Sequence, residues 1–89
     1  MMKLIIAILH HTDGEQALEA LTAEHFGVTR ISSSGGFLRP ANATLLIGVE
    51  AGQVVRAVQL IREHSGPPAD EGLKRATVFV LNVERHEEV

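Results

Sequence analysis

The sequence predicts an α/β fold in which four strands and two helices follow one another in the order βαββαβ. Strands are indicated by aliphatic runs at residues 2–9, 43–49 and 76–83 and by a more polar run at 28–33. Helices are indicated after the runs at 2–9 and 43–49, where apolar side chains recur at helical spacing. Two βαβ halves with right-handed crossovers make a ferredoxin-like sandwich, in which two helices pack on one four-stranded antiparallel sheet.

The first half of the chain is expected to contain a buried strand and an amphipathic helix. Residues 2–9 are apolar throughout, which favours a strand buried on both faces. Asp13 is expected to cap a helix at 15–25, with Gln16 at the capping-box position. The apolar stripe of this helix would consist of Ala17, Leu18, Leu21 and His25. Gly27 then supplies the stop.

The second half repeats this pattern. Residues 43–49 are expected to form a central strand, in which Gly48 suggests a bulge or a close approach by another backbone or a ligand. A second helix is expected at 50–64 without a strong N-cap, and its apolar stripe consists of Val54, Ala57, Val58 and Ile61. A loop at 65–72 leads to the last strand, and the charged tail at 84–89 is expected to fray.

The distribution of apolar residues predicts an oligomer. In this fold the first and third strands are central and the other two lie at the edges, which agrees with the polar character of 28–33. Both helices cover one face of the sheet, yet the strands at 4–9, 43–49 and 78–81 carry aliphatic side chains on both faces. An uncovered second face would expose more apolar surface than a monomer usually does. We therefore predict a homo-oligomer in which another subunit covers this face.

Length, charge and composition exclude several classes of protein. The 89 residues are expected to form one domain spanning 1–89. The net charge is −3 and the longest basic run is the pair Lys74-Arg75, so we expect no long nucleic acid as a partner. The opening apolar run is much too short to span a bilayer, so we expect no membrane partner. The chain has no cysteine, which fits a cytoplasmic protein.

Residues 32–42 join the two middle strands and combine several groups that contact ligands. The adjacent Gly35 and Gly36 allow positive φ and a close approach of the backbone, and successive amide N–H groups can then form an anion-binding nest. Arg39 adds a planar fork suited to phosphate or carboxylate, and Pro40 biases it toward an extended conformation. The alternative is a hairpin loop whose glycines serve only the turn.

The sequence gives little support for catalysis or for a metal. It contains no GxxxxGK[ST], GxGxxG, GxSxG or HExxH motif, and nothing places a His–carboxylate pair beside the serines at 32–34. His10 and His11 are expected to point to opposite sides of an extended strand, so they do not chelate together easily. We expect no enzymatic activity, no metal and no cofactor.

Four segments of the sequence share a specific pattern with one known family. They are MKLIIAI at 2–8, SGGFLR at 34–39, NATLLIGV at 42–49 and ATVFVL at 76–81. In register over nearly the whole chain, these segments resemble the cyclic di-AMP receptor family of PII-like signalling proteins, whose pattern is TGGFLR…N.T..IG. Ser34 replaces the leading Thr of that pattern, and Ala43 replaces a later Thr.

The resemblance implies a homotrimer of ferredoxin-like subunits that binds a nucleotide in clefts between neighbours and has no enzymatic activity. The positions that match the ligand contacts of the family, together with two further loop residues, form the candidate set Thr29, Gly35, Gly36, Phe37, Leu38, Arg39, Asn42 and Gly48. Phe37 and Leu38 would pack on a base, loop amides would meet phosphate, and Asn42 would pair with a base edge. For Phe37 the alternative role is a plug at the subunit interface.

The chain also departs from the family pattern. His25 stands where the family has Asn, and Gly27 stands where it has an Arg aimed at the phosphates. Arg30 and Arg39 are the cations that could replace the lost charge. The loop at 65–72 is also shorter than in the family. Two functions therefore stay open: a receptor for cyclic di-AMP or a related adenine nucleotide, and a trimeric scaffold or protein-interaction module that has lost its nucleotide.

Overall fold

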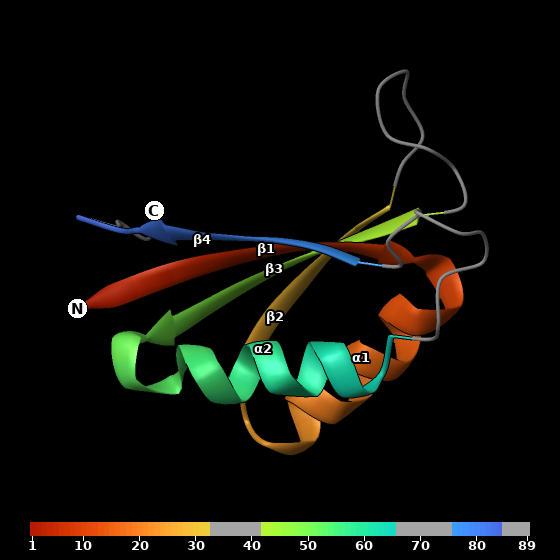
Figure 1. The fold of residues 1–89 in the computed structure, drawn as a ribbon, viewed down its shortest axis with the longest axis horizontal. Helices are drawn as coiled ribbons and strands as arrows, with labels where there is room; N and C mark the ends of the chain where they lie inside the picture. The colour runs from red at the N-terminus through yellow and green to blue at the C-terminus, as the bar shows by residue number, and fades with distance from the viewer. Residues whose placement is uncertain (33–41, 66–75, 85–89) are drawn as a thin grey trace.

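The computed structural model describes residues 1–32, 42–65 and 76–84, which form one sheet and a layer of two helices (Figure 1). The elements in chain order are β1 (Met2–His10), α1 (His11–Ala23), β2 (Gly27–Ser32), β3 (Asn42–Glu50), the 3₁₀ turn η1 (Ala51–Gln53), α2 (Val54–Glu63) and β4 (Ala76–Asn82). The predicted order of strands and helices is confirmed. The predicted loop beyond residue 65 and the predicted tail beyond residue 84 lie outside the described residues.

The sheet is antiparallel throughout and has the strand order β2-β3-β1-β4, so the predicted central and edge strands are confirmed. β1 and β3 pair without interruption from one end to the other. Gly48 pairs with Leu4 inside this unbroken register, and the bulge predicted as one role for Gly48 is therefore wrong. The other role, a close approach by another backbone or a ligand, stays a prediction, since the atom that a Cβ at Gly48 would meet is Cε of the Met2 side chain at 3.3 Å.

The hydrophobic core lies between the helices and one face of the sheet. Its largest fully buried side chains are those of Ile5, Leu9, Leu21, Leu45, Ile47 and Ile61. α1 packs closely against β3 at Gly14, where an added Cβ would lie only 2.8 Å from Cβ of Ala43. Glycine is unfavourable inside a helix, by about 1 kcal/mol relative to alanine. At this position it allows the helix to approach the sheet.

α1 begins four residues before the predicted start. His10 occupies the N-cap and makes no side-chain capping bond, because β1 leads directly into the helix. Asp13 is buried within the first turn, where its carboxylate is well placed for the helix dipole. The predicted cap at Asp13 and capping box at Gln16 are therefore wrong. α2 begins at Val54, four residues after the predicted start, because a 3₁₀ turn precedes it, and the absence of a side-chain cap is as predicted.

α1 ends in a Schellman motif that the sequence pattern does not reveal. The amide of Phe26 donates to the carbonyl of Leu21 at 3.0 Å, and the amide of His25 donates to that of Thr22 at 2.9 Å. His25 holds the left-handed position of this motif, with φ 67°, and its side chain is exposed. His25 therefore lies outside the buried stripe, contrary to prediction. The stop is at His25, and Gly27 is the first residue of β2.

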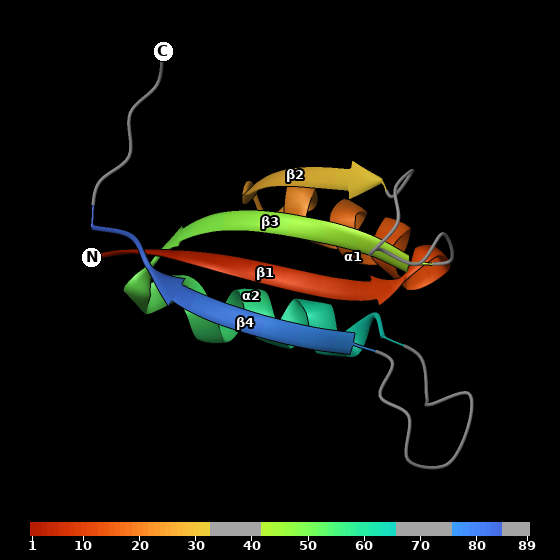
Figure 2. The ribbon, with the colours of Figure 1, turned by 90° about the horizontal axis from the view of Figure 1, so that it is seen from above.

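The face of the sheet turned away from the helices, here called the open face, is apolar. Figure 2 looks onto this face, with both helices behind the strands. Ile31, Phe79 and Leu81 are 39%, 50% and 47% exposed on it, and the half-buried Leu4 and Leu46 lie between them. The aliphatic residues predicted for both faces are thus confirmed. The homo-oligomer that would cover this face stays a prediction.

Candidate functional site

Three of the candidate ligand-binding residues lie in the described part of the chain, and all three are on the open face. Thr29 pairs with Leu46, and Gly48 pairs with both Leu4 and Gly27. Thr29 and Gly48 are exposed, and Asn42 is half-buried at the start of β3. The other candidates lie outside the described residues; they are Gly35, Gly36, Phe37, Leu38 and Arg39.

Asn42 and Gly48 lie toward opposite ends of β3, and Thr29, which pairs with Leu46 at the middle of this strand, is nearer to Gly48. Thr29 lies beside the cross-strand pair of Gly27 and Gly48. Asn42 pairs with His10 at the other end of β3, next in the chain to residues 33–41. Asn42 and Gly48 are six positions apart, which corresponds to about 20 Å along a strand. One mononucleotide-sized group cannot contact both ends within a single chain.

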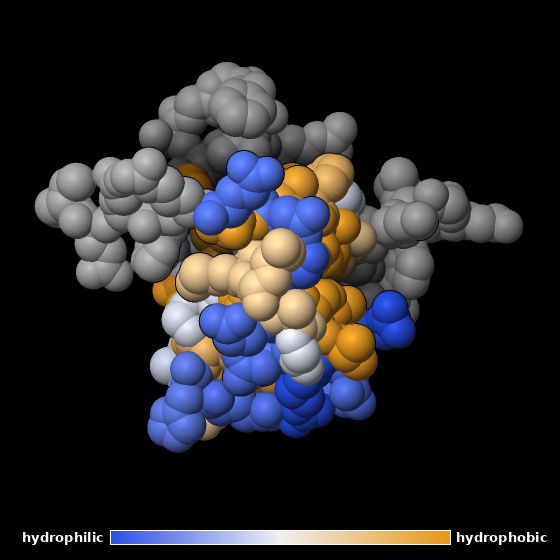
Figure 3. All heavy atoms as spheres, turned by 90° about the vertical axis from the view of Figure 1, so that its left-hand side faces the viewer, coloured by the Kyte–Doolittle hydropathy of each residue, from blue (hydrophilic) through white to orange (hydrophobic). Residues whose placement is uncertain are grey.

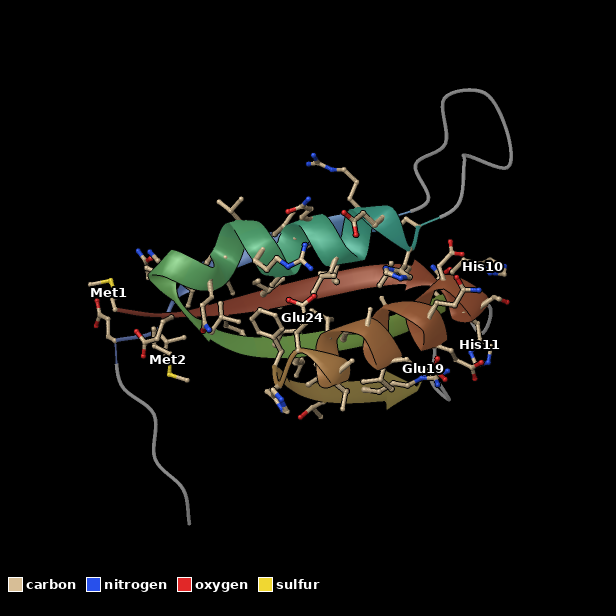
Figure 4. All side chains as sticks on the ribbon, turned by 90° about the horizontal axis from the view of Figure 1, so that it is seen from below. Met1, Met2, His10, His11, Glu19 and Glu24 are labelled. Atoms are coloured by element: carbon tan, nitrogen blue, oxygen red, sulfur yellow. The ribbon has the colours of Figure 1, made fainter. Side chains whose placement is uncertain are left out.

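A hollow of about 270 Å³ opens at the Gly48 end of the sheet. It is lined by Met2, Lys3, Leu4, Gly48 and Val83, and Figure 4 shows Met2 at this end of the molecule. A Cβ at Gly27 would meet nothing within 4 Å. Gly27 therefore leaves bare backbone against which a flat group could lie, whereas the end of the Met2 side chain lies over the neighbouring Gly48. The amine of Lys3 is engaged, since it donates to Oδ1 of Asn82.

Arg30 lies on the opposite face of β2, toward α1. Its Nη2 lies 2.8 Å from Nδ1 of His11, and its Nη1 lies 3.5 Å from Oε1 of Glu15. Because a guanidinium only donates, Nδ1 of His11 is the acceptor in this contact. Arg30 therefore cannot replace the charge that Gly27 lacks on the open face. The alternation of side chains along a strand already places Thr29 and Arg30 on opposite faces.

An ion pair that the sequence reasoning missed links the two helices beside this site. Nε of Arg56 donates to Oε1 of Glu24 at 2.9 Å, and Nη2 of Arg56 donates to Oε2. Figure 4 shows Glu24 between α1 and α2. The hydrogen bond from Arg56 lowers the pKa of the Glu24 carboxyl, and the same bond raises the pKa of Arg56. The pair holds the end of α1, and with it the turn that leads to Gly27, against α2.

The described residues bring together no group of three His, Asp or Glu side chains that could hold a metal ion. His10 and His11 lie where β1 passes into α1 (Figure 4), and His11 contacts Glu15 and Arg30. Within residues 1–32, 42–65 and 76–84, no helix has both the length and the hydrophobicity needed to cross a membrane.

Comparison with known proteins agrees with this architecture. The crystal structure of a functionally unknown protein from Pediococcus pentosaceus ATCC 25745 superposes with a TM-score of 0.77 and 29% sequence identity. The alignment covers 99% of this chain and 97% of that one. Residues 2–68 match the model of a family described as the cyclic-di-AMP receptor. Since this match spans β1 through α2 and includes the candidate residues on β2 and β3, the chain belongs to the cyclic-di-AMP receptor family.

Proposed function

We propose that this protein is a non-enzymatic signalling receptor that binds cyclic di-AMP or a related adenine nucleotide between the subunits of a homotrimer. The observation that carries the proposal is the separation of Asn42 from Gly48 and the neighbouring Thr29 along the open face. Thr29 and Gly48 from one subunit form one wall of the cleft, and Asn42 with the loop at 33–41 from its neighbour forms the other. When the Gly48 end of one subunit lies against the Asn42 end of its neighbour, groups that are about 20 Å apart within one chain come together.

The apolar open face supports the oligomer on which this site depends. Phe79, Leu81 and Ile31 are all more than a third exposed on a face that no described segment covers. Covering such side chains is favourable by about 25 cal/mol per Å² of apolar surface. Because the candidate residues lie on this same face, assembly would build the ligand clefts at the margins of the subunit contact.

Different residues of the cleft would contact the base and the phosphates of the nucleotide. The bare backbone at Gly27, beside Gly48, would accept the flat surface of a base, and the side-chain amide of Asn42 would pair with a base edge. Arg39 and the loop amides would then carry the phosphate charge, since Arg30 lies on the helix side of the sheet.

The experiment that tests the shared site is complementation between two defective variants. Gly48→Ala adds one methyl group at the lining of the hollow, and Asn42→Ala removes the amide. Each variant alone is expected to lose binding of cyclic di-AMP in calorimetric titration. Refolded together in equal amounts, the two should recover intact clefts at about a quarter of the sites, because some neighbouring pairs then combine both native walls.

Two controls make this test specific. Gly52→Ala adds the same methyl group at an exposed position with nothing within 4 Å, and it should bind like the wild type. A mixture that stays as defective as its components would contradict a cleft shared between subunits. ATP, ADP and AMP titrated in parallel would identify the preferred nucleotide.

The second candidate function is a trimeric scaffold or protein-interaction module without a nucleotide. The observation that favours it is Gly27, which leaves open space where the family has a charged side chain. An oligomer of the expected mass that gives no heat and no thermal shift with any of the four nucleotides would select this function over the receptor.

A further inference from the structure

One side of α2 brings aliphatic side chains to the surface, where Val55 is exposed beside Val54 and Val58, which are half-buried and also pack against the core. α2 buries Ala57, Leu60 and Ile61 against the sheet. On its other side Val55 is 78% exposed, as much as the chain-terminal Met1. Hydrophobic side chains also reach the surface in the end-on view of Figure 3, which faces the end of the molecule where β1 starts. A single exposed valine is common, so the surroundings of Val55 decide what it indicates.

Val55 borders a hollow of about 480 Å³ that runs along the helix. One side of the hollow is the row Val54, Val58 and Arg62, and the other side is Val55 with Gln59. Within each row the residues are four apart, so each row is a ridge of the helix surface and the hollow is the groove between two ridges. The longer row extends about 12 Å, a little over two helical turns. A groove of this form accepts a ridge of side chains from a second helix.

The charges around the groove are unequal. Arg56 is engaged by Glu24, and Glu63 accepts a hydrogen bond from Nε2 of Gln59 at 3.2 Å. The guanidinium of Arg62, which borders the groove, makes no hydrogen bond or ion pair with any other described residue. The groove therefore has valines toward its amino-terminal end and, toward its carboxyl-terminal end, a guanidinium without a partner among residues 1–32, 42–65 and 76–84.

We propose that this groove docks an amphipathic helix of a partner protein that carries aliphatic side chains and a carboxylate. The aliphatic side chains fill the space between Val54, Val55 and Val58, and the carboxylate pairs with Arg62. The homo-oligomer expected above would use the open face of the sheet, which leaves the groove on the helix layer for a different partner. The groove lies on the helix layer, so the proposal does not depend on the nucleotide site.

The test is a selection from a displayed library of 16-residue helical peptides, with six positions along one face randomised. Against the full-length protein, selected peptides should share aliphatic residues three or four apart and an Asp or Glu about one turn away. Val55→Asp should weaken their binding at least tenfold in fluorescence anisotropy. Arg62→Glu should weaken it similarly, and selection against that variant should yield Lys or Arg in place of the acidic residue.

The controls separate this outcome from others. Glu19→Arg reverses a charge on the exposed side of α1 and should leave peptide binding unchanged. Val55 and Arg62 are exposed, so circular dichroism should show that both variants fold. Absence of enriched peptides, peptides that bind all variants equally, or a charge preference that ignores Arg62→Glu would each overturn the proposal. A change in oligomer mass caused by Val55→Asp would assign the groove to a second copy instead.

Discussion

The contact between Gly14 and Ala43 gives a sharp test of how α1 packs on the sheet. Gly14→Ala improves helix propensity by about 1 kcal/mol. It also places two Cβ atoms 2.8 Å apart, well inside the 3.5–4.0 Å at which carbon atoms pack. Overpacking in a buried site usually costs about 1–3 kcal/mol. We expect the clash to outweigh the gain and Gly14→Ala to lose about 1 kcal/mol of unfolding free energy, or about 4–8 °C in Tm.

The measurement is urea unfolding followed by circular dichroism, at one fixed protomer concentration because an oligomer unfolds by mass action. Gly52→Ala is the matched control, since its added methyl group meets nothing within 4 Å. Ala43→Gly should rescue Gly14→Ala, with a coupling of about 0.5–3 kcal/mol between the two sites. If Gly14→Ala is as stable as the wild type and shows no coupling to Ala43→Gly, the close packing of α1 on β3 is refuted.

Three further predictions follow from the faces of the sheet, the helix end and the ion pair. Leu45→Ala should cost about 2–5 kcal/mol of unfolding free energy because Leu45 is fully buried. Leu46 lies on the open face, so Leu46→Ala should chiefly change the oligomer mass measured by light scattering. Equal losses of unfolding free energy in the two variants would contradict this assignment of faces. His25→Gly should stabilise the fold by about 1 kcal/mol in urea unfolding, because it relieves a left-handed backbone position; a loss would mean that the imidazole makes a contact that outweighs the strain. Arg56→Gln should return the pKa of Glu24 toward its ordinary value in an NMR titration of the carboxyl carbon. A carboxyl whose pKa is lowered by folding stabilises the fold at pH values above its unfolded-state pKa. This stabilisation is lost as the pH falls through the folded-state pKa, so any stability advantage of the wild type over Arg56→Gln should disappear in acid. An unchanged Glu24 titration would contradict the pair.

The candidate site was only partly accessible from the sequence. The resemblance to the family selected Thr29, Asn42 and Gly48, and the structure places all three on one face. Their separation along this face depends on strand register, which a residue pattern alone does not measure. The pair of Glu24 and Arg56 is likewise invisible to local patterns, because 32 positions separate its members along the chain.

The order of strands and helices, the central position of β1 and β3 and the apolar open face were determined by the sequence alone. Hydrophobic periodicity is a property of each local stretch of sequence, so it indicates which side chains are buried without knowledge of the other segments. Only the tertiary structure decided where α1 starts and ends, since His10 caps it as β1 passes directly into it, and His25 ends it in a left-handed turn. It also decided that Gly14 meets Ala43 and that Arg30 contacts His11. These outcomes depend on distances between segments remote in sequence, which no single stretch of residues encodes.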